Sequence, residues 1–249
     1  MSIWDTYDSR FMIKGGCVRE AVQRRTFRTI HDKVVDSLSY EAVEIDGLAR
    51  EAAILSSDDF ASKTIISLPG EKLHHGGLVS WNHSFWLISE CDVQDPVYAK
   101  GKMIRCNHLL KWVSVDGDIH EQWCRVEDGT EYKNGEYEDR EFIVTRGDTR
   151  IAITIAKNKH TVLLNRESRF LIDDPDAEHK LAYQLTKPLK TGNVYGRNGV
   201  YRFILQEVMS TDDDCHELGI ADYYKYYERE NVTEEDSENH GTTTKEGWI

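Results

Sequence analysis

The chain has 249 residues, of which 39% are apolar and 30% charged, with 44 acidic against 31 basic side chains. This composition is typical of a globular protein and excludes a chain that is disordered throughout. No stretch approaches 18 consecutive apolar residues, and the first residues lack the basic start and apolar run of a signal peptide, so we expect a protein made and kept in a cytoplasm, without membrane contact. The five cysteines are odd in number and never spaced as C-x-x-C, which argues against a disulfide framework.

Basic residues gather near the start of the chain. Residues 9–33 carry seven Lys or Arg against two acids. Their apolar residues follow neither one helical stripe nor strict alternation, so we interpret residues 1–38 as a basic arm or an irregular helix. This arm is either a solvated face or a segment that docks on an acidic protein surface or lies near nucleic-acid phosphates. The candidate partner-contact residues are Arg10, Lys14, Arg19, Arg24, Arg25 and Arg28.

Tight turns divide the middle of the chain into short segments. Asp-Gly or Asn-Gly pairs, which tolerate the positive φ angles of hairpin turns, occur at residues 46–47, 116–117, 128–129, 134–135 and 198–199. Runs rich in β-branched and aromatic residues predict strands at 78–81, 85–89, 109–113, 119–126, 142–145, 150–155, 169–172, 180–186 and 200–208. Residues 48–55 suit a helix equally well, but the preceding turn favours a hairpin strand.

The predicted fold is mainly β, with two small β-barrel or β-sandwich domains. We divide the chain into the arm (1–38), a β-barrel-like domain (39–115), a second, sandwich-like β domain (116–210) and an acidic C-terminal tail (211–249). Residues 207–249 carry thirteen acids against three bases, which is typical of a solvated or partner-ordered tail.

One cluster has the residue types of a zinc site. Cys106, His108, His120 and Cys124 flank the predicted turn at Asp116-Gly117. A two-residue turn would pair Val113 with His120, Lys111 with Gln122 and Leu109 with Cys124, which splits the four ligands between the two faces of the ribbon. The same register would put Trp112 and Trp123 on one face, as a core or interface. We therefore expect no zinc, unless a bulge shifts the register by one residue.

Other chemical motifs are weaker. The acidic turns at residues 173–176 and 212–214 lack the spacing of a calcium loop and are interpreted as solvated turns. The His74-His75 pair lies in a glycine-flanked loop, where we expect solvent exposure. Phosphate-binding, dinucleotide-binding, nucleophile-elbow and zinc-protease motifs do not occur in the sequence. We therefore expect no cofactor, no metal and no enzymatic activity.

Several strings resemble virion proteins of tailed bacteriophages that infect Gram-positive hosts, encoded among head and neck genes. They include SIWDTYD at residues 2–8, CNHLLKW at 106–112 and RFLIDDP at 169–175. Further strings lie at residues 37–40, 43–47, 77–79, 86–88, 127–130, 135–140, 147–152, 201–203 and 221–225. The resemblance covers nearly all of the chain except the final tail and transfers no catalytic residue. Residues 77–88 are also similar to the hairpin of head-closure proteins.

The resemblance implies a structural protein of the virion neck, assembled in the host cytoplasm. Such a protein forms a homo-oligomeric ring that joins head to tail and helps to retain packaged DNA. Its expected partners are further copies of itself and neighbouring portal, adaptor or tail-terminator proteins, with non-specific proximity to DNA. The alternatives are a capsid decoration or tail-end protein and, outside the virion, a soluble binding module or metal-assisted enzyme.

Overall fold

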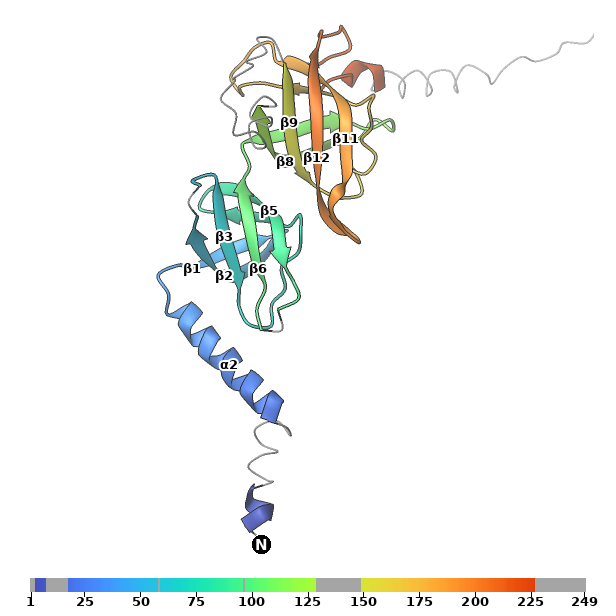
Figure 1. Cartoon of the computed structure of the whole chain (residues 1–249). Helices are drawn as coiled ribbons and strands as arrows, with labels where there is room; N and C mark the ends of the chain where they lie inside the picture. Colours follow the sequence, from blue (N-terminus) through green and yellow to red (C-terminus); the bar gives the residue numbers. More distant parts are fainter. Residues whose placement is uncertain (1–2, 8–17, 58, 96, 129–148, 227–249) are drawn as a thin grey trace, which may run out of the picture. The chain divides into compact units, whose positions relative to one another are not determined.

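A computed structural model describes residues 3–7, 18–57, 59–95, 97–128 and 149–226 (Figure 1). It divides the chain into two compact units, which separate between Asn107 and His108. The first unit also includes Ile155–Asn158 and Lys190–Tyr201. Both units are β structures, which confirms the predicted fold class. Among the helices in the described ranges, none is long and apolar enough to cross a membrane.

Helix α2 (Val18–Val35) is an α-helix of 18 residues within the segment that the sequence pattern left as a basic arm or an irregular helix. Its sequence contains neither Gly nor Pro, so no residue interrupts the backbone hydrogen bonds. Glu20 in the first turn and Lys33 in the last turn complement the helix dipole. These local preferences form the helix although its apolar residues are few.

A closed six-stranded barrel forms the body of the first unit. Its strands are β1 (Tyr40–Ile45), β2 (Leu48–Ser56), β3 (Ser62–Ser67), β4 (Leu78–Trp81), β5 (Ser84–Asp92) and β6 (Lys100–Arg105). All neighbouring pairs are antiparallel, in the order β1-β2-β3-β6-β5-β4, and β4 closes the barrel on β1. Closure leaves no free sheet edge in the barrel.

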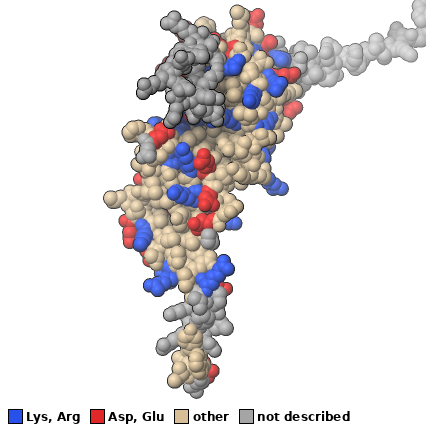
Figure 2. All heavy atoms as spheres, in the orientation of Figure 1, with Lys and Arg blue, Asp and Glu red and all other residues tan. Residues whose placement is uncertain are grey.

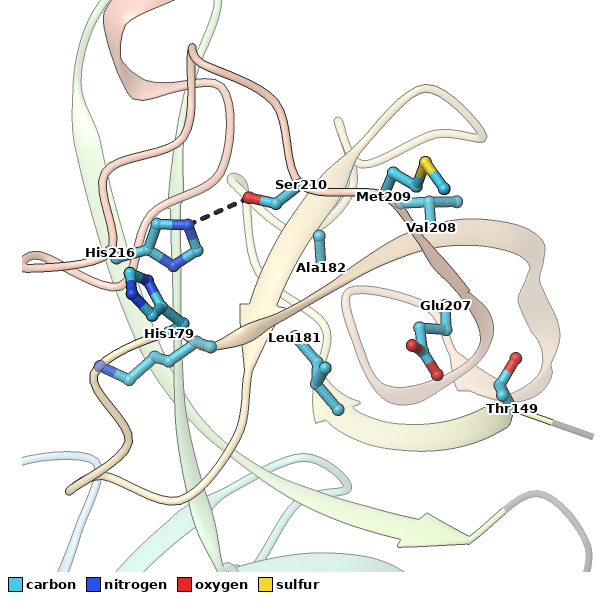
Figure 3. Close-up of a pocket in the computed structure, with 10 residues that line it drawn as sticks. Thr149, His179, Leu181, Ala182, Glu207, Val208, Met209, Ser210 and His216 are labelled. Carbon is cyan, nitrogen blue, oxygen red and sulfur yellow. Dashed lines mark hydrogen bonds between the residues drawn. The ribbon is translucent and has the colours of Figure 1, made fainter. Parts of the chain in front are cut away.

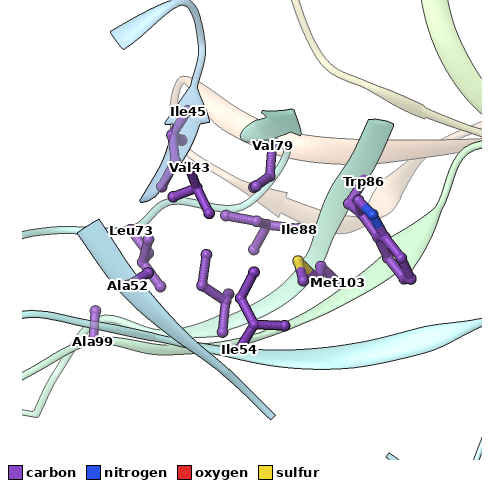
Figure 4. Close-up of a cluster of buried hydrophobic side chains, with 11 residues drawn as sticks. Val43, Ile45, Ala52, Ile54, Leu73, Val79, Trp86, Ile88, Ala99 and Met103 are labelled. Atoms are coloured by element: carbon purple, nitrogen blue, oxygen red, sulfur yellow. The ribbon is translucent and has the colours of Figure 1, made fainter. Parts of the chain in front are cut away.

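Local turn chemistry sets two hairpins of this barrel. Asp46 and Gly47 connect β1 to β2 with φ angles of 51° and 79°, as the Asp-Gly pair predicts. Asn82 and His83 connect β4 to β5 with φ angles of 47° and 56°. The barrel interior is filled by the side chains in Figure 4, which are Val43, Ile45, Ala52, Ile54, Ile65, Leu73, Val79, Trp86, Ile88, Ala99 and Met103. Burial of each large side chain stabilises the fold by about 1.5–3 kcal/mol.

The second unit is built on another six-stranded, barrel-like sheet. Its strands are β7 (His108–Val113), β8 (Ile119–Asp128), β9 (Arg150–Ala156), β10 (Arg169–Ile172), β11 (Leu181–Tyr195) and β12 (Asn198–Val208). The strand order is β10-β11-β12-β9-β8-β7, and the edge strands β10 and β7 lie close together because the sheet curls. Strand β7, which the division at residue 115 assigned to the first domain, therefore belongs to the second sheet. The strand predicted at 142–145 falls outside the described residues.

The β7–β8 register differs by one residue from the predicted register. His108 pairs with Cys124, Leu110 with Gln122 and Trp112 with His120. The connection spans residues 114–118, where Ser114 N donates to Asp118 O over 2.8 Å and Gly117 has φ 85°, so it is longer than a two-residue turn. Trp112 and Trp123 consequently lie on opposite faces, which corrects the prediction that they share one.

This register also removes the geometric argument against zinc, because His108, His120 and Cys124 now share a face. His120 lies four residues from Cys124 along β8, a separation of about 13 Å at the usual rise of a strand. Within the described ranges, His, Cys, Asp and Glu form no group of three or more that could hold a metal ion.

Candidate interaction surfaces

The candidate arginines of the arm lie on α2. Arg19, Arg24, Arg25 and Arg28 are exposed to solvent, whereas Arg10 and Lys14 lie outside the described residues. Figure 2 shows Lys and Arg atoms at the surface of this helix. The structure therefore makes the four described arginines available to a partner.

Helix α2 has an apolar row as well as basic side chains. Phe27, Ile30 and Val34 follow the i, i+3, i+7 spacing of one helical face, and each is only half-buried. At 100° per residue, Arg19 and Arg24 flank this row on its two sides, and Arg25 lies on the opposite face. The row is hard to see in the sequence because Val22, which is exposed, does not lie on the same helical face.

The second unit contains an open cleft of about 690 Å³ (Figure 3). It lies where β11 begins and β12 ends. Leu181, Ala182, Val208 and Met209 form its apolar wall, and its polar groups come from Thr149, His179, Lys180, Glu207, Ser210 and His216. Leu181 and Met209 are 44% and 91% exposed, so the cleft presents apolar surface to solvent.

Ser210 and His216 form a close pair in this cleft. Ser210 Oγ lies 3.0 Å from His216 Nε2 and 3.0 Å from Asp214 Oδ2. Burial alone would raise the pKa of Asp214, but hydrogen bonds from the Thr211 and Asp222 N–H groups and the charge of Arg169 hold it below its ordinary value. Asp214 is therefore an ionised carboxylate, which can only accept hydrogen bonds.

The positions of the protons that Ser210 and His216 share follow from the negative charge of Asp214. Ser210 has a single hydroxyl proton, which it donates to the Asp214 carboxylate, so its oxygen accepts from His216 Nε2–H. Nucleophilic catalysis would require the reverse, with an unprotonated Nε2 accepting the serine proton. The pair therefore has the residue types of a Ser–His dyad, but with this tautomer its hydrogen bonds run in the opposite direction.

Arg169 on β10 holds this wall in place. Its guanidinium contacts Asp214 Oδ2 over 3.0 Å and Asp222 Oδ1 over 2.6 Å, and it donates to Met209 O and Thr211 Oγ1. The Asp214 side chain is fully buried. The interpretation of residues 212–214 as a solvated turn is therefore wrong for Asp214. No sequence motif signals this site, because Arg169 and Asp214 are 45 residues apart.

Two exposed acidic loops meet beside the cleft. One, which we call the β10–β11 loop, carries Asp174, Asp176 and Glu178, and the other carries Asp212, Asp213 and Glu217. The rings of His179 and His216 connect the two loops, with centroids 5.4 Å apart and planes at 87°. The cleft therefore combines an apolar wall with acidic surroundings.

A second cavity of about 290 Å³ lies elsewhere in the second unit, and two histidines line it. The rings of His120 and His160 lie 3.9 Å apart, and Trp112 packs against His120 at 5.7 Å. Partial desolvation and the neighbouring His120 lower the pKa of His160, which favours the neutral ring. The stack attaches the β9–β10 connection to strands β7 and β8.

The predicted solvent exposure of His74 and His75 is correct only in part, because both side chains are partly exposed and each also has a partner. His74 Nε2 lies 3.1 Å from Asp46 Oδ2, and the His75 ring stacks on Tyr195 with centroids 4.2 Å apart, both within the first unit. Hydrogen bonding to Asp46 raises the pKa of His74.

Comparisons with known proteins leave the function open. No protein-family model matches the chain, and no curated protein matches it. One solved structure with likeness to it is MrkH, described as a c-di-GMP-dependent transcription regulatory factor, with 10% identity, a TM-score of 0.23 and coverage of 86% of this chain and 88% of that one. Another is the Bacillus subtilis inhibitor of motility MotI/DgrA, with 10% identity, a TM-score of 0.22 and coverage of 78% and 97%. At these TM-scores neither likeness carries an argument about this chain.

Proposed function

We propose that the chain is a non-catalytic structural protein of a tailed-bacteriophage virion. In this proposal, copies of the chain form a ring in the neck that joins head to tail and helps to retain packaged DNA. The strings quoted in the sequence analysis support a virion role, and the two β units are compatible with it.

Helix α2 is the observation that carries the proposal. It presents four exposed arginines, two of which flank a half-buried apolar row, and a helix of this length gains most of its stability from packing of its apolar face. A ring requires such a surface, because each copy must contact its neighbours through two different patches. The Ser210–His216 pair does not compete with this interpretation, since its proton arrangement disfavours nucleophilic catalysis.

Electron cryomicroscopy of intact particles tests the proposal. We expect density for the chain as a ring between portal and tail after refinement with the rotational symmetry of the neck. Density on the capsid shell or at the tail end would overturn the neck assignment in favour of a decoration or tail-end protein. Absence of the chain from purified particles, measured by quantitative mass spectrometry, would overturn the virion role altogether.

A further inference from the structure

We propose that α2 of one copy binds in the cleft of the second unit of another copy. This inference rests on the proposed ring and names the contact that would build it. The occupant of the cleft is thus a second copy of this chain.

The helix and the cleft both present apolar side chains at the proposed contact. Phe27, Ile30 and Val34 have the spacing of the anchor residues with which an amphipathic helix enters a groove. The cleft offers Leu181 and Met209 as exposed apolar partners, and it is open to solvent along its apolar wall. Contact would remove both apolar surfaces from water.

The charges of the two partners are opposite. Helix α2 carries five basic and two acidic side chains, a net charge of +3. The two loops that contribute His179 and His216 to the cleft carry six exposed acids, namely Asp174, Asp176, Glu178, Asp212, Asp213 and Glu217, whereas the lining itself has one basic residue, Lys180, and one acidic residue, Glu207. Arginines that flank the apolar row would face these loops when the row enters the cleft, and this complementarity selects the orientation of the helix.

Charge and apolarity together favour this occupant over two others. Pairing of α2 with α2 of another copy would bring like charges together, which is unfavourable. Nucleic acid would satisfy the arginines through its phosphates, but a phosphate backbone would leave Phe27, Ile30 and Val34 without an apolar partner. A surface that is both apolar and acidic satisfies both properties of the helix.

The geometry of such a contact leads to rings or filaments. Helix and cleft are different patches of the same chain, so each copy offers one of each and the contact is heterologous. When every copy makes this contact with the next, the copies close into a ring if the rotation from one copy to the next is a whole-number fraction of 360°.

Reciprocal charge reversal tests the inference on the purified full-length chain. One variant reverses the helix flanks (Arg19→Glu with Arg24→Glu), and the other reverses the β10–β11 loop (Asp176→Lys with Glu178→Lys). The control reverses two exposed charges of the first unit that lie outside α2 and away from the proposed contact (Lys72→Glu with Lys102→Glu). Circular dichroism checks that each variant folds, and sedimentation equilibrium measures self-association.

We expect the unmodified chain and the control to associate with the same affinity, and each reversed variant alone to associate at least tenfold more weakly. A 1:1 mixture of the two reversed variants should regain association, because the acidic helix of one then meets the basic loop of the other. Association without any response to either reversal would overturn the helix–cleft contact and leave the ring proposal standing. Failure of the mixture to recover would also overturn the contact. A chain that stays monomeric at all concentrations would overturn the contact itself, whereas the ring proposal would still be decided by particle imaging.

Discussion

Arg169 Nη1 lies 2.6 Å from Asp222 Oδ1, and Nη2 of the same guanidinium lies 3.0 Å from the buried Asp214 Oδ2. One arginine on β10 thus binds two carboxylates of the segment that follows β12. Ser210 and His216 belong to the same hydrogen-bond network, because Ser210 bonds to Asp214 and to His216. Arg169 therefore fixes one wall of the cleft.

Substitution Arg169→Ala should destabilise the second unit by about 3–5 kcal/mol, because it leaves the Asp214 carboxylate buried without its cation. Urea unfolding followed by fluorescence measures the change. The control Arg166→Ala removes an exposed arginine nearby and should cost under about 0.5 kcal/mol. Equal effects of the two substitutions would show that the network contributes little.

The lowered pKa of Asp214 predicts a component of acid sensitivity. Its stabilising contribution is fully present above the unfolded-state pKa of about 3.8 and is lost as the pH falls through the lower folded-state pKa. Asp214→Asn should therefore lower the unfolding free energy at pH 7 and weaken its decline between pH 4 and 2. If the unfolding free energy of this variant declined between pH 4 and 2 as steeply as that of the unmodified chain, the lowered pKa of Asp214 would be contradicted.

The His74–Asp46 pair predicts the opposite dependence at higher pH. The pKa of His74 is raised, so its contribution is fully present below the unfolded-state pKa of about 6.5 and is lost as the pH rises through the folded-state pKa. Both side chains are partly exposed, which limits the effect to about 0.2–1 kcal/mol. His74→Asn should thus lower the unfolding free energy more at pH 5.5 than at pH 9, and equal losses at the two pH values would contradict the raised pKa of His74.

Gly76 and Gly70 form a matched pair of positions, with φ angles of +81° and +91°. A Cβ at Gly76 would lie 2.2 Å from the backbone oxygen of Gly199, whereas a Cβ at Gly70 would have no heavy atom within 4 Å. Gly70→Ala should cost only the backbone strain, about 1 kcal/mol, and Gly76→Ala clearly more. Thermal unfolding compares the two, and equal losses would exclude the close backbone approach.

Cys91 should react slowly with thiol reagents although it is only half-buried. Desolvation, and to a lesser extent the charge of Asp92, raise its pKa to about 11 from 9.0. The thiolate fraction at pH 8 should be about 100-fold below that of a free thiol, and the alkylation rate should be lower by a smaller factor because a thiolate of higher pKa is more nucleophilic. Iodoacetamide labelling followed by peptide mass spectrometry measures this rate at Cys91, and a rate equal to that of a model peptide would contradict the raised pKa.

Part of the fold was readable from local sequence. Asp46-Gly47 predicted its hairpin because residues with positive φ angles are needed there, and strands β4 and β10 begin and end where the β-branched and aromatic runs do. Strands β3 and β6, which complete the barrel, were not among the strands predicted from the sequence. Strand β6 reads Lys-Gly-Lys-Met-Ile-Arg, and only its place between β3 and β5 makes it a strand.

The sequence by itself determined the mainly β class, the local hairpins and the uneven distribution of charge, because these properties depend on residues close together in the chain. Tertiary structure alone decided the β7–β8 register, where a longer connection shifted every pair by one residue. It also decided that Asp214 is buried while its neighbours Asp212 and Asp213 are exposed. Ionised carboxylates are buried only where a distant partner compensates the lost solvation, and Arg169 reaches Asp214 only after the strands between them have folded.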